Sequence, residues 1–198
     1  MTTTGATDGR VARGARNRDA LVEALLELLR EGSLQPRARE IADRAGLSLR
    51  TVFLHFDDLE SLYGSAADHQ AAHLAARYSA LSTDGPTGDR IASLVRRRAE
   101  IYEEIAPVRR AGRLVAPASP VLTRRLADTA AWYRREVARV LEPELAALDG
   151  RRRADALAGL DLALSWEAWD GLRRVQRLSV AAARRVTTLL VERLLASL

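Results

Sequence analysis

Cysteine and lysine are both absent from the 198 residues of this chain, and aromatic residues make up only 5% of it. The lack of cysteine excludes a disulfide framework, a cysteine-based zinc site and a thiol nucleophile. No stretch approaches the roughly 18 consecutive apolar residues of a membrane span. Residues 1–10 contain no apolar segment of the kind found in a secretory signal. We therefore expect a cytoplasmic protein that does not contact a membrane.

The absence of lysine changes how the charge is interpreted, because all 31 basic residues are arginine. The formal net charge is +5 and the isoelectric point is about 10.5, a value that arginine inflates because it titrates higher than lysine. Residues 1–64 contain nine arginines and ten acidic residues, so the basic excess lies in the remainder of the chain. The net charge is therefore weak evidence for a nucleic-acid partner.

Alanine and leucine, both strong helix formers, account for about a third of the residues, and alternating β-type patterns are rare. This composition predicts an all-α protein. Residues 1–16 have no periodic apolar face, so we expect a disordered arm there. Its end is basic, with Arg10, Arg13, Arg16 and Arg18. Such an arm is either a solvated tail or a segment that contacts DNA phosphates or the minor groove.

Three helices are expected over residues 17–31, 37–45 and 48–55, and the last two have the spacing of a helix-turn-helix. Gly46 permits the left-handed backbone that the turn requires, and Ser48 is a suitable N-cap. Val52 and Phe56 would anchor the third helix in the core. Its opposite side would then be free to enter a major groove.

Further helices are expected in the rest of the chain, and prolines and glycines mark their ends. Pro107, Pro120 and Gly150 separate them, and Pro143 would kink or split one. The expected ranges are about 58–81, 89–105, 107–116, 119–148, 152–176 and 179–197.

The sequence REIADRAGLSLRTVFLHF at residues 39–56, followed by LESL at 59–62, resembles the TetR family of bacterial transcription regulators. The small, turn and aromatic positions agree with the family pattern at fixed spacing. The resemblance implies a helix-turn-helix DNA-binding domain over residues 17–63. It also implies a helical domain over residues 64–198 that binds a small-molecule effector and forms a homodimer.

Within this resemblance, Arg50 is the candidate for bidentate bonding to guanine, and Arg39 is a second candidate for DNA contact. Leu49 would either touch a thymine methyl or simply cover the helix. Ser48 would either contact DNA or only cap the N-terminus of the third helix. Two positions depart from the family pattern. Phe53 replaces a tyrosine and Leu59 replaces a lysine, so two phosphate contacts are expected to be missing. The expected DNA-binding residues are Arg37, Arg39, Ser48, Leu49, Arg50, Thr51, Phe53 and His55.

The second predicted domain offers candidates for an effector pocket and for a dimer interface. The aromatic residues Tyr102, Trp132 and Trp166 are candidate pocket walls. A helix with two apolar faces precedes the last helix, so one of these faces is free for a dimer seam, although a monomer could bury both. The expected dimer residues are Leu162, Trp169, Val186, Leu189 and Arg193.

The other charged groups predict no catalytic or metal centre. His69 and His73 have metal-ligand spacing, but they lack further His or Cys partners, so we expect ordinary half-buried polar residues and no metal or other cofactor. The arginine triplets at 96–98 and 151–153 are expected on solvated helix faces. No nucleophile or phosphate-binding motif occurs, so we expect no enzyme. The sequence predicts a ligand-responsive repressor that binds a pseudo-palindromic operator, with a small-molecule-binding protein lacking DNA function as the alternative.

Overall fold

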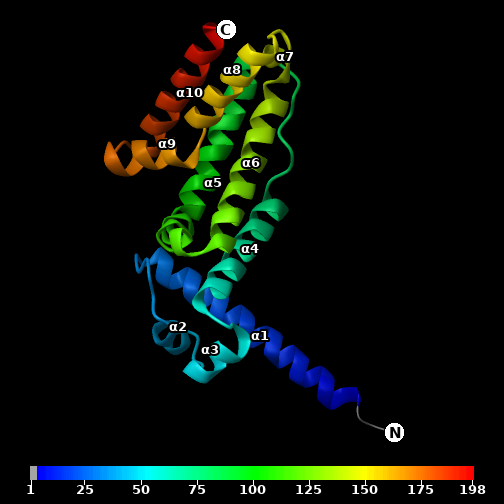
Figure 1. Ribbon diagram of the computed structural model, residues 1–198, viewed down its shortest axis with the longest axis vertical. Coiled ribbons are helices and arrows are strands. Elements are labelled where there is room, and N and C mark those ends of the chain that lie inside the picture. The colour runs from blue at the N-terminus through cyan, green and yellow to red at the C-terminus, as the bar shows by residue number, and fades with distance from the viewer. Residues whose placement is uncertain (1–3) are drawn as a thin grey trace. The chain divides into compact units, whose positions relative to one another are not determined.

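The computed structural model describes residues 4–198, and every regular element in that range is helical, which confirms the all-α prediction. The helices are shown in Figure 1. They are α1 (Thr4–Arg30), α2 (Ala38–Arg44), α3 (Leu49–His55), α4 (Leu59–Arg77), α5 (Thr87–Val115), the 3-10 turn η1 (Ala116–Ala118), α6 (Pro120–Val140), α7 (Glu142–Ala146), α8 (Gly150–Ala163), α9 (Trp166–Asp170), the π-helical turn η2 (Gly171–Val175) and α10 (Val180–Ala196). None of these helices combines the length and apolar character needed to cross a bilayer.

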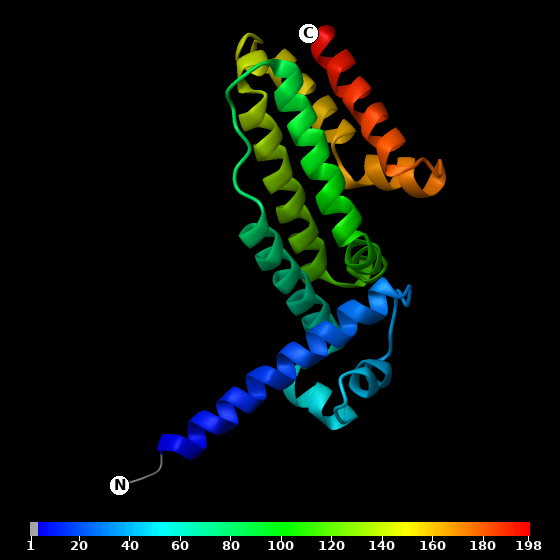
Figure 2. The ribbon, with the colours of Figure 1, turned by 180° about the vertical axis from the view of Figure 1, so that it is seen from behind.

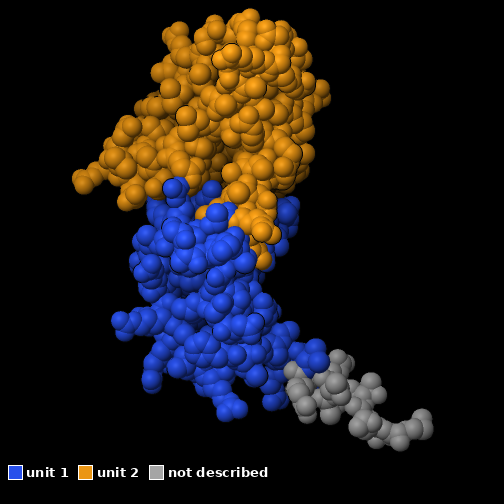
Figure 3. Space-filling model, in the orientation of Figure 1, with its two compact units in different colours: residues 1–77, 105–123 blue, residues 78–104, 124–198 orange. Residues whose placement is uncertain are grey.

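The chain divides into two compact units, which Figure 3 colours separately. Unit 1 comprises residues 1–77 and 105–123, and unit 2 comprises residues 78–104 and 124–198. The boundary predicted at residue 64 differs from this division, because the whole of α4 belongs to unit 1. Leu62 and Ala66 of α4 are fully buried there, and α4 packs along α1.

Helix α1 begins at Thr4, so residues 4–16 are helical where a disordered arm was predicted. Residues 1–3 and the side chains of residues 4–8 and of Arg10 lie outside the described part of the structure. The second half of α1 is fixed by packing, with Leu21 and Leu25 completely buried. Because extending an existing helix costs far less free energy than nucleating one, the alanine- and arginine-rich first half continues it.

The core of unit 1 joins α1 to α2, α3 and α4. Figure 2 shows α2 and α3 on one side of α1. Most of the apolar side chains predicted to face inward are buried, and Leu28 and Ala45 are only partly buried. Each helix has its leucines, isoleucine, valine or alanines on one face. The residues at 2% exposure or less include Leu21, Leu25, Leu29, Ile41, Ala42, Val52, Phe56 and Leu62.

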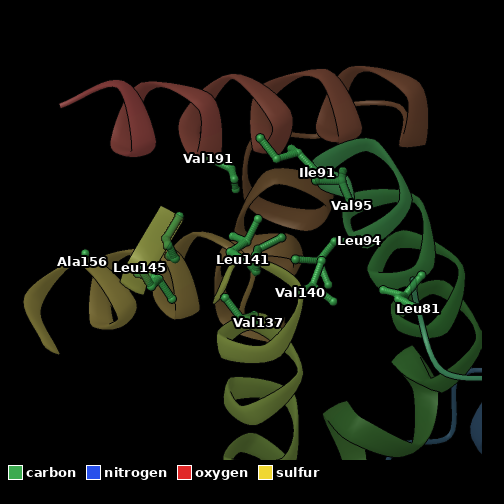
Figure 4. Packing of buried hydrophobic residues seen from close by; sticks show 12 residues of the cluster. Leu81, Ile91, Leu94, Val95, Val137, Val140, Leu141, Leu145, Ala156 and Val191 are labelled. Atoms are coloured by element: carbon green, nitrogen blue, oxygen red, sulfur yellow. The ribbon is translucent and has the colours of Figure 1, made fainter. Parts of the chain in front are cut away.

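The core of unit 2 is formed by helices that come from its two sequence segments. Figure 4 shows Leu94 of α5, Val137 and Val140 of α6 and Val191 of α10 converging on this cluster. Helices α8 and α10 also pack together. Gly159 of α8 faces Leu194 of α10, and a Cβ at this position would make an ordinary contact with the Leu194 side chain.

Two helix boundaries differ from the sequence predictions, and the split predicted at Pro143 is confirmed, since α6 ends at Val140 and α7 begins at Glu142. Helix α5 continues through Pro107, where an end was expected. Pro143 lies in the first turn of the short helix α7, where its missing N–H costs no helical hydrogen bond. The expected long helix over 152–176 is broken after Ala163, because Ser165 caps a new helix by accepting a hydrogen bond from the Ala168 amide at 3.1 Å.

Candidate nucleic-acid interface

The helix-turn-helix of unit 1 is closed by local hydrogen bonds. Gly46 has φ = +65°, the left-handed conformation predicted for the turn, and the Leu47 amide donates to the carbonyl of Ala42 at 2.9 Å. The hydroxyl of Ser48 accepts a hydrogen bond from the Thr51 amide at 3.1 Å, which confirms Ser48 as the N-cap of α3. These contacts determine the direction in which α3 leaves the turn.

Helix α3 has one buried and one exposed side. Val52 and the C-cap Phe56 are 1% and 2% exposed, so they anchor the helix as predicted. Arg50 is exposed on the other side and forms no ion pair within the described residues. A guanidinium that is free of protein partners can donate two parallel hydrogen bonds to guanine or to a phosphate.

The other polar candidates for DNA binding lie in three different environments. Arg37 and Arg39 are exposed near the start of α2 and form no ion pair within the described chain. By contrast, the hydroxyls of Ser48 and Thr51 lie 2.8 Å apart and are hydrogen-bonded to each other. His55 is half-buried at the last position of α3.

Arg18, which the sequence placed in a basic arm, has a structural role instead. Its guanidinium donates to the carbonyl of His55 at 2.9 Å and to the hydroxyl of Ser65 at 2.7 Å. It also lies 4.3 Å from the ring centre of Phe56. A cation at the C-terminus of a helix is favourable because the last carbonyls are partly negative. Arg18 therefore links α1 to the end of α3, a role that residue spacing along α1 does not reveal.

Arg44 is also engaged by carboxylates, on the side where α2 meets α1. It lies 2.7 Å from Glu31 and 3.4 Å from Glu27. The hydrogen bond from Arg44 lowers the pKa of the Glu31 carboxyl below its ordinary value, outweighing the opposite effect of burial. Both acids are exposed, so the pair orients α2 on α1 and contributes little to stability.

The aromatic candidates for an effector pocket lie in unit 2, and two of them are core residues. Tyr102 and Trp166 are 1% and 3% exposed, and their rings meet edge to face at 5.7 Å. The hydroxyl of Tyr102 donates to the carbonyl of Leu164 at 2.9 Å, where α8 ends. Trp132 is instead half exposed and contacts the ring of Tyr133. The structure therefore places Tyr102 against Trp166 and leaves Trp132 on the surface.

A buried ion pair lies beside these aromatic rings and was missed by the sequence reasoning. Arg98 and Glu136 are 2% and 7% exposed, and their side chains approach to 2.9 Å. Arg98 also donates to the Tyr133 carbonyl and stacks 4.0 Å from the Tyr133 ring centre. The prediction of a solvated face for residues 96–98 is wrong for Arg98. The helical rotation turns this third arginine toward α6, where Glu136 compensates its charge.

A hollow of about 360 Å³ lies on the surface of unit 2, between α5 and α10. None of the predicted effector residues lines it. Its walls are Ala92, Val95, Ala181, Arg184, Arg185, Thr188, Leu189 and Glu192.

The candidate dimer residues are divided between surface and core. Leu162 of α8 and Leu189 of α10 are 67% and 50% exposed, and Arg193 is exposed as well. Val186 is half-buried. Trp169 is only 4% exposed, and its indole N–H donates to Glu103 at 2.9 Å. Trp169 is thus covered by its own chain because the break after α8 turns α9 inward.

His69 and His73 were predicted to be half-buried polar residues that bind no metal. The Nε2 of His69 lies 2.9 Å from a carboxylate oxygen of Glu23 on α1. Both side chains are about half exposed. Among the described residues, no group of three or more His, Asp or Glu side chains is placed to hold a metal ion.

Comparison with solved structures shows where this fold occurs. A transcriptional regulator from Rhodococcus sp. Rha1 superimposes with a TM-score of 0.71, at 20% sequence identity, over 91% of this chain and 96% of that one. A TetR-family transcriptional regulator from Streptomyces coelicolor gives a TM-score of 0.64, at 21% identity, over 91% of this chain and 79% of that one. No protein-family model and no curated protein matches the sequence. The chain thus has the helical fold of TetR-family transcriptional regulators.

Proposed function

We propose that this protein is a DNA-binding transcriptional regulator, acting as a repressor, that binds a pseudo-palindromic operator as a homodimer. The observation that carries this proposal is the Gly46 turn between α2 and α3, which leaves the unpaired Arg50 exposed on α3. The fold shared with transcriptional regulators supports it. In such a dimer, two copies of α3 would enter successive major grooves about 34–36 Å apart, or a small multiple of that distance.

The dimer contact in this proposal is formed by the outer faces of α8 and α10. Leu162, Leu189 and Leu190 are large apolar side chains that are 44–67% exposed on these two packed helices. A second copy would bury them, because symmetric dimers place the same apolar surface on both sides of the interface. Trp169 has no part in this contact, since its own chain covers it.

Regulation in this proposal comes from a small-molecule effector that binds unit 2. Of the predicted effector residues, Trp132 is half exposed, whereas Tyr102 and Trp166 are buried beside the pair Arg98–Glu136, so an effector would have to open this packing to reach them. The effector would favour a dimer geometry in which the two copies of α3 no longer match the spacing of the operator. This is a shift of populations, so it requires the effector to bind the two geometries with different affinity.

The test is selection of DNA sequences by the purified full chain, followed by affinity measurements with Arg50→Ala. We expect this variant to lose about 1–3 kcal/mol of binding free energy and its preference at one guanine. Arg151→Ala is the matched control, since it removes the same charge from a side chain that is 93% exposed on α8. If the chain selects no sequence even at low salt, the alternative of a small-molecule-binding protein without DNA function gains support.

A further inference from the structure

The exposed side of α3 carries three large apolar side chains. Leu49, Phe53 and Leu54 are 40%, 54% and 76% exposed. Three of the seven residues of α3 are therefore large apolar side chains in contact with water. Exposed apolar surface of this kind is unfavourable unless a partner covers it.

The polar groups of α3 and its cap leave few donors for reading bases. The hydroxyls of Ser48 and Thr51 are hydrogen-bonded to each other, and Ser48 also caps the helix. The side chain of His55 is half-buried at the end of the helix. Arg50 is thus the one long polar side chain on the exposed side of α3.

The exposed residues form one continuous surface. At about 100° of rotation per residue, Leu49, Phe53, Arg50 and Leu54 follow one another around an arc of about 140°. The apolar side chains therefore lie on both sides of Arg50. Helix α3 contains no acidic residue, so no carboxylate within this surface would repel DNA.

We propose that Leu49, Phe53 and Leu54 recognise the C5-methyl groups of thymines that flank the guanine bound by Arg50. This inference rests on the DNA-binding role proposed above and specifies the operator half-site for that role. In the major groove only thymine presents a methyl group, and apolar side chains read it by direct contact. Contact with these methyls covers the exposed apolar surface of α3 and at the same time distinguishes T·A pairs from the others.

The experiment removes one methyl group at a time from the DNA. The full chain first selects its operator from random duplexes, and each thymine of one half-site is then replaced singly by deoxyuridine. Deoxyuridine keeps every hydrogen-bonding group of thymine and lacks only the methyl. We expect affinity to fall about fourfold at one or more thymines beside the recognised guanine, which corresponds to about 0.8 kcal/mol for one buried methyl-sized group.

Protein variants then assign each methyl to a side chain. In Leu49→Ala, Phe53→Ala or Leu54→Ala, the deoxyuridine effect should disappear at the thymine that the deleted side chain touches. Leu114→Ala is the matched control, because Leu114 is 52% exposed on α5, outside α3, and should keep the full effect. Circular dichroism of each variant checks that its helices are intact.

The outcomes separate this inference from the function on which it rests. If the chain selects a sequence but every deoxyuridine duplex binds as tightly as its thymine counterpart, the methyl reading is wrong and the regulatory role stands. The methyl reading is also wrong if the methyl losses persist unchanged in all three α3 variants. If no DNA sequence is selected, both proposals fail.

Discussion

Arginine, the only long basic residue in this chain, occupies three different environments. Arg50 is exposed and unpaired on α3, Arg18 holds the end of that helix, and Arg98 is buried against Glu136. The guanidinium group suits all three, because it can donate five hydrogen bonds and also stack on aromatic rings. The same residue type therefore contributes to the proposed DNA contact, to the support of that contact and to the core of unit 2.

Replacing Arg18 with alanine should weaken the attachment of α3 to α1. The change removes two hydrogen bonds and the contact with the Phe56 ring, and we expect a loss of about 1 kcal/mol in the free energy of unfolding, measured with urea. Amide hydrogen exchange in α3 should also become faster. Arg16→Ala is the control, since Arg16 is exposed on the same helix and forms no ion pair within the described residues. Equal stability of the two variants would contradict the supporting role of Arg18.

At the scale of the helices, one polar cluster connects the start of α5 to the end of α6 and to α7. Arg90 pairs with both carboxylate oxygens of Glu144 and donates to the carbonyl of Val140 at 2.5 Å. Thr87 donates to the same carboxylate at 2.6 Å. Burial alone would raise the pKa of Glu144, but the hydrogen bonds from Arg90 and Thr87 outweigh it and lower this pKa below its ordinary value of 4.5.

This lowered pKa predicts how the stability of the protein depends on pH. The ionised Glu144 stabilises the folded chain fully above about pH 4.5, where the unfolded chain has also lost this proton, and the contribution is lost as the pH falls through the folded pKa. Glu144→Gln should therefore cost about 1.5–3 kcal/mol at pH 7 and progressively less below pH 4.5. Thermal unfolding at a series of pH values measures this difference. Glu192→Gln, at an exposed carboxylate, should show no such trend, and a pH-independent effect of Glu144→Gln would refute the role of the charge.

At the scale of the whole molecule, the proposed function depends on assembly. One copy of α3 reads only half of a pseudo-palindromic operator, so specific binding requires a second copy held at a defined spacing. The apolar side chains exposed on α8 and α10 are the surface that a second copy would cover. Dimer stability and operator affinity should therefore change together.

Leu162→Glu and Leu189→Glu test this link between assembly and binding. Each change puts a carboxylate into both halves of a symmetric contact and removes two buried leucines. We therefore expect dimer dissociation to increase about 100-fold or more, with a parallel loss of operator affinity. Analytical ultracentrifugation measures the first effect and a gel-shift assay the second. Val175→Glu is the control, because Val175 is 72% exposed in the π-helical turn, outside α8 and α10. A dimer that survives both leucine changes would place the contact elsewhere.

Local sequence determined much of unit 1. The helical periodicity, the glycine of the turn and the Ser48 cap act over a few residues, so the α2–α3 motif and the anchoring roles of Val52 and Phe56 could be predicted. The helical state of residues 4–16 could not, because it depends on the packed half of α1 to nucleate it.

Tertiary structure decided the roles of residues whose partners are distant in the chain. Arg18 meets His55 and Ser65, Arg98 meets Glu136, and the indole of Trp169 meets Glu103. Amphipathic periodicity shows which side of a helix is buried but not which distant side chain will lie opposite it. For this reason the sequence alone determined the helical fold and the candidate recognition helix. Only the folded chain showed which arginines are free to meet a partner and which are already bound within the protein.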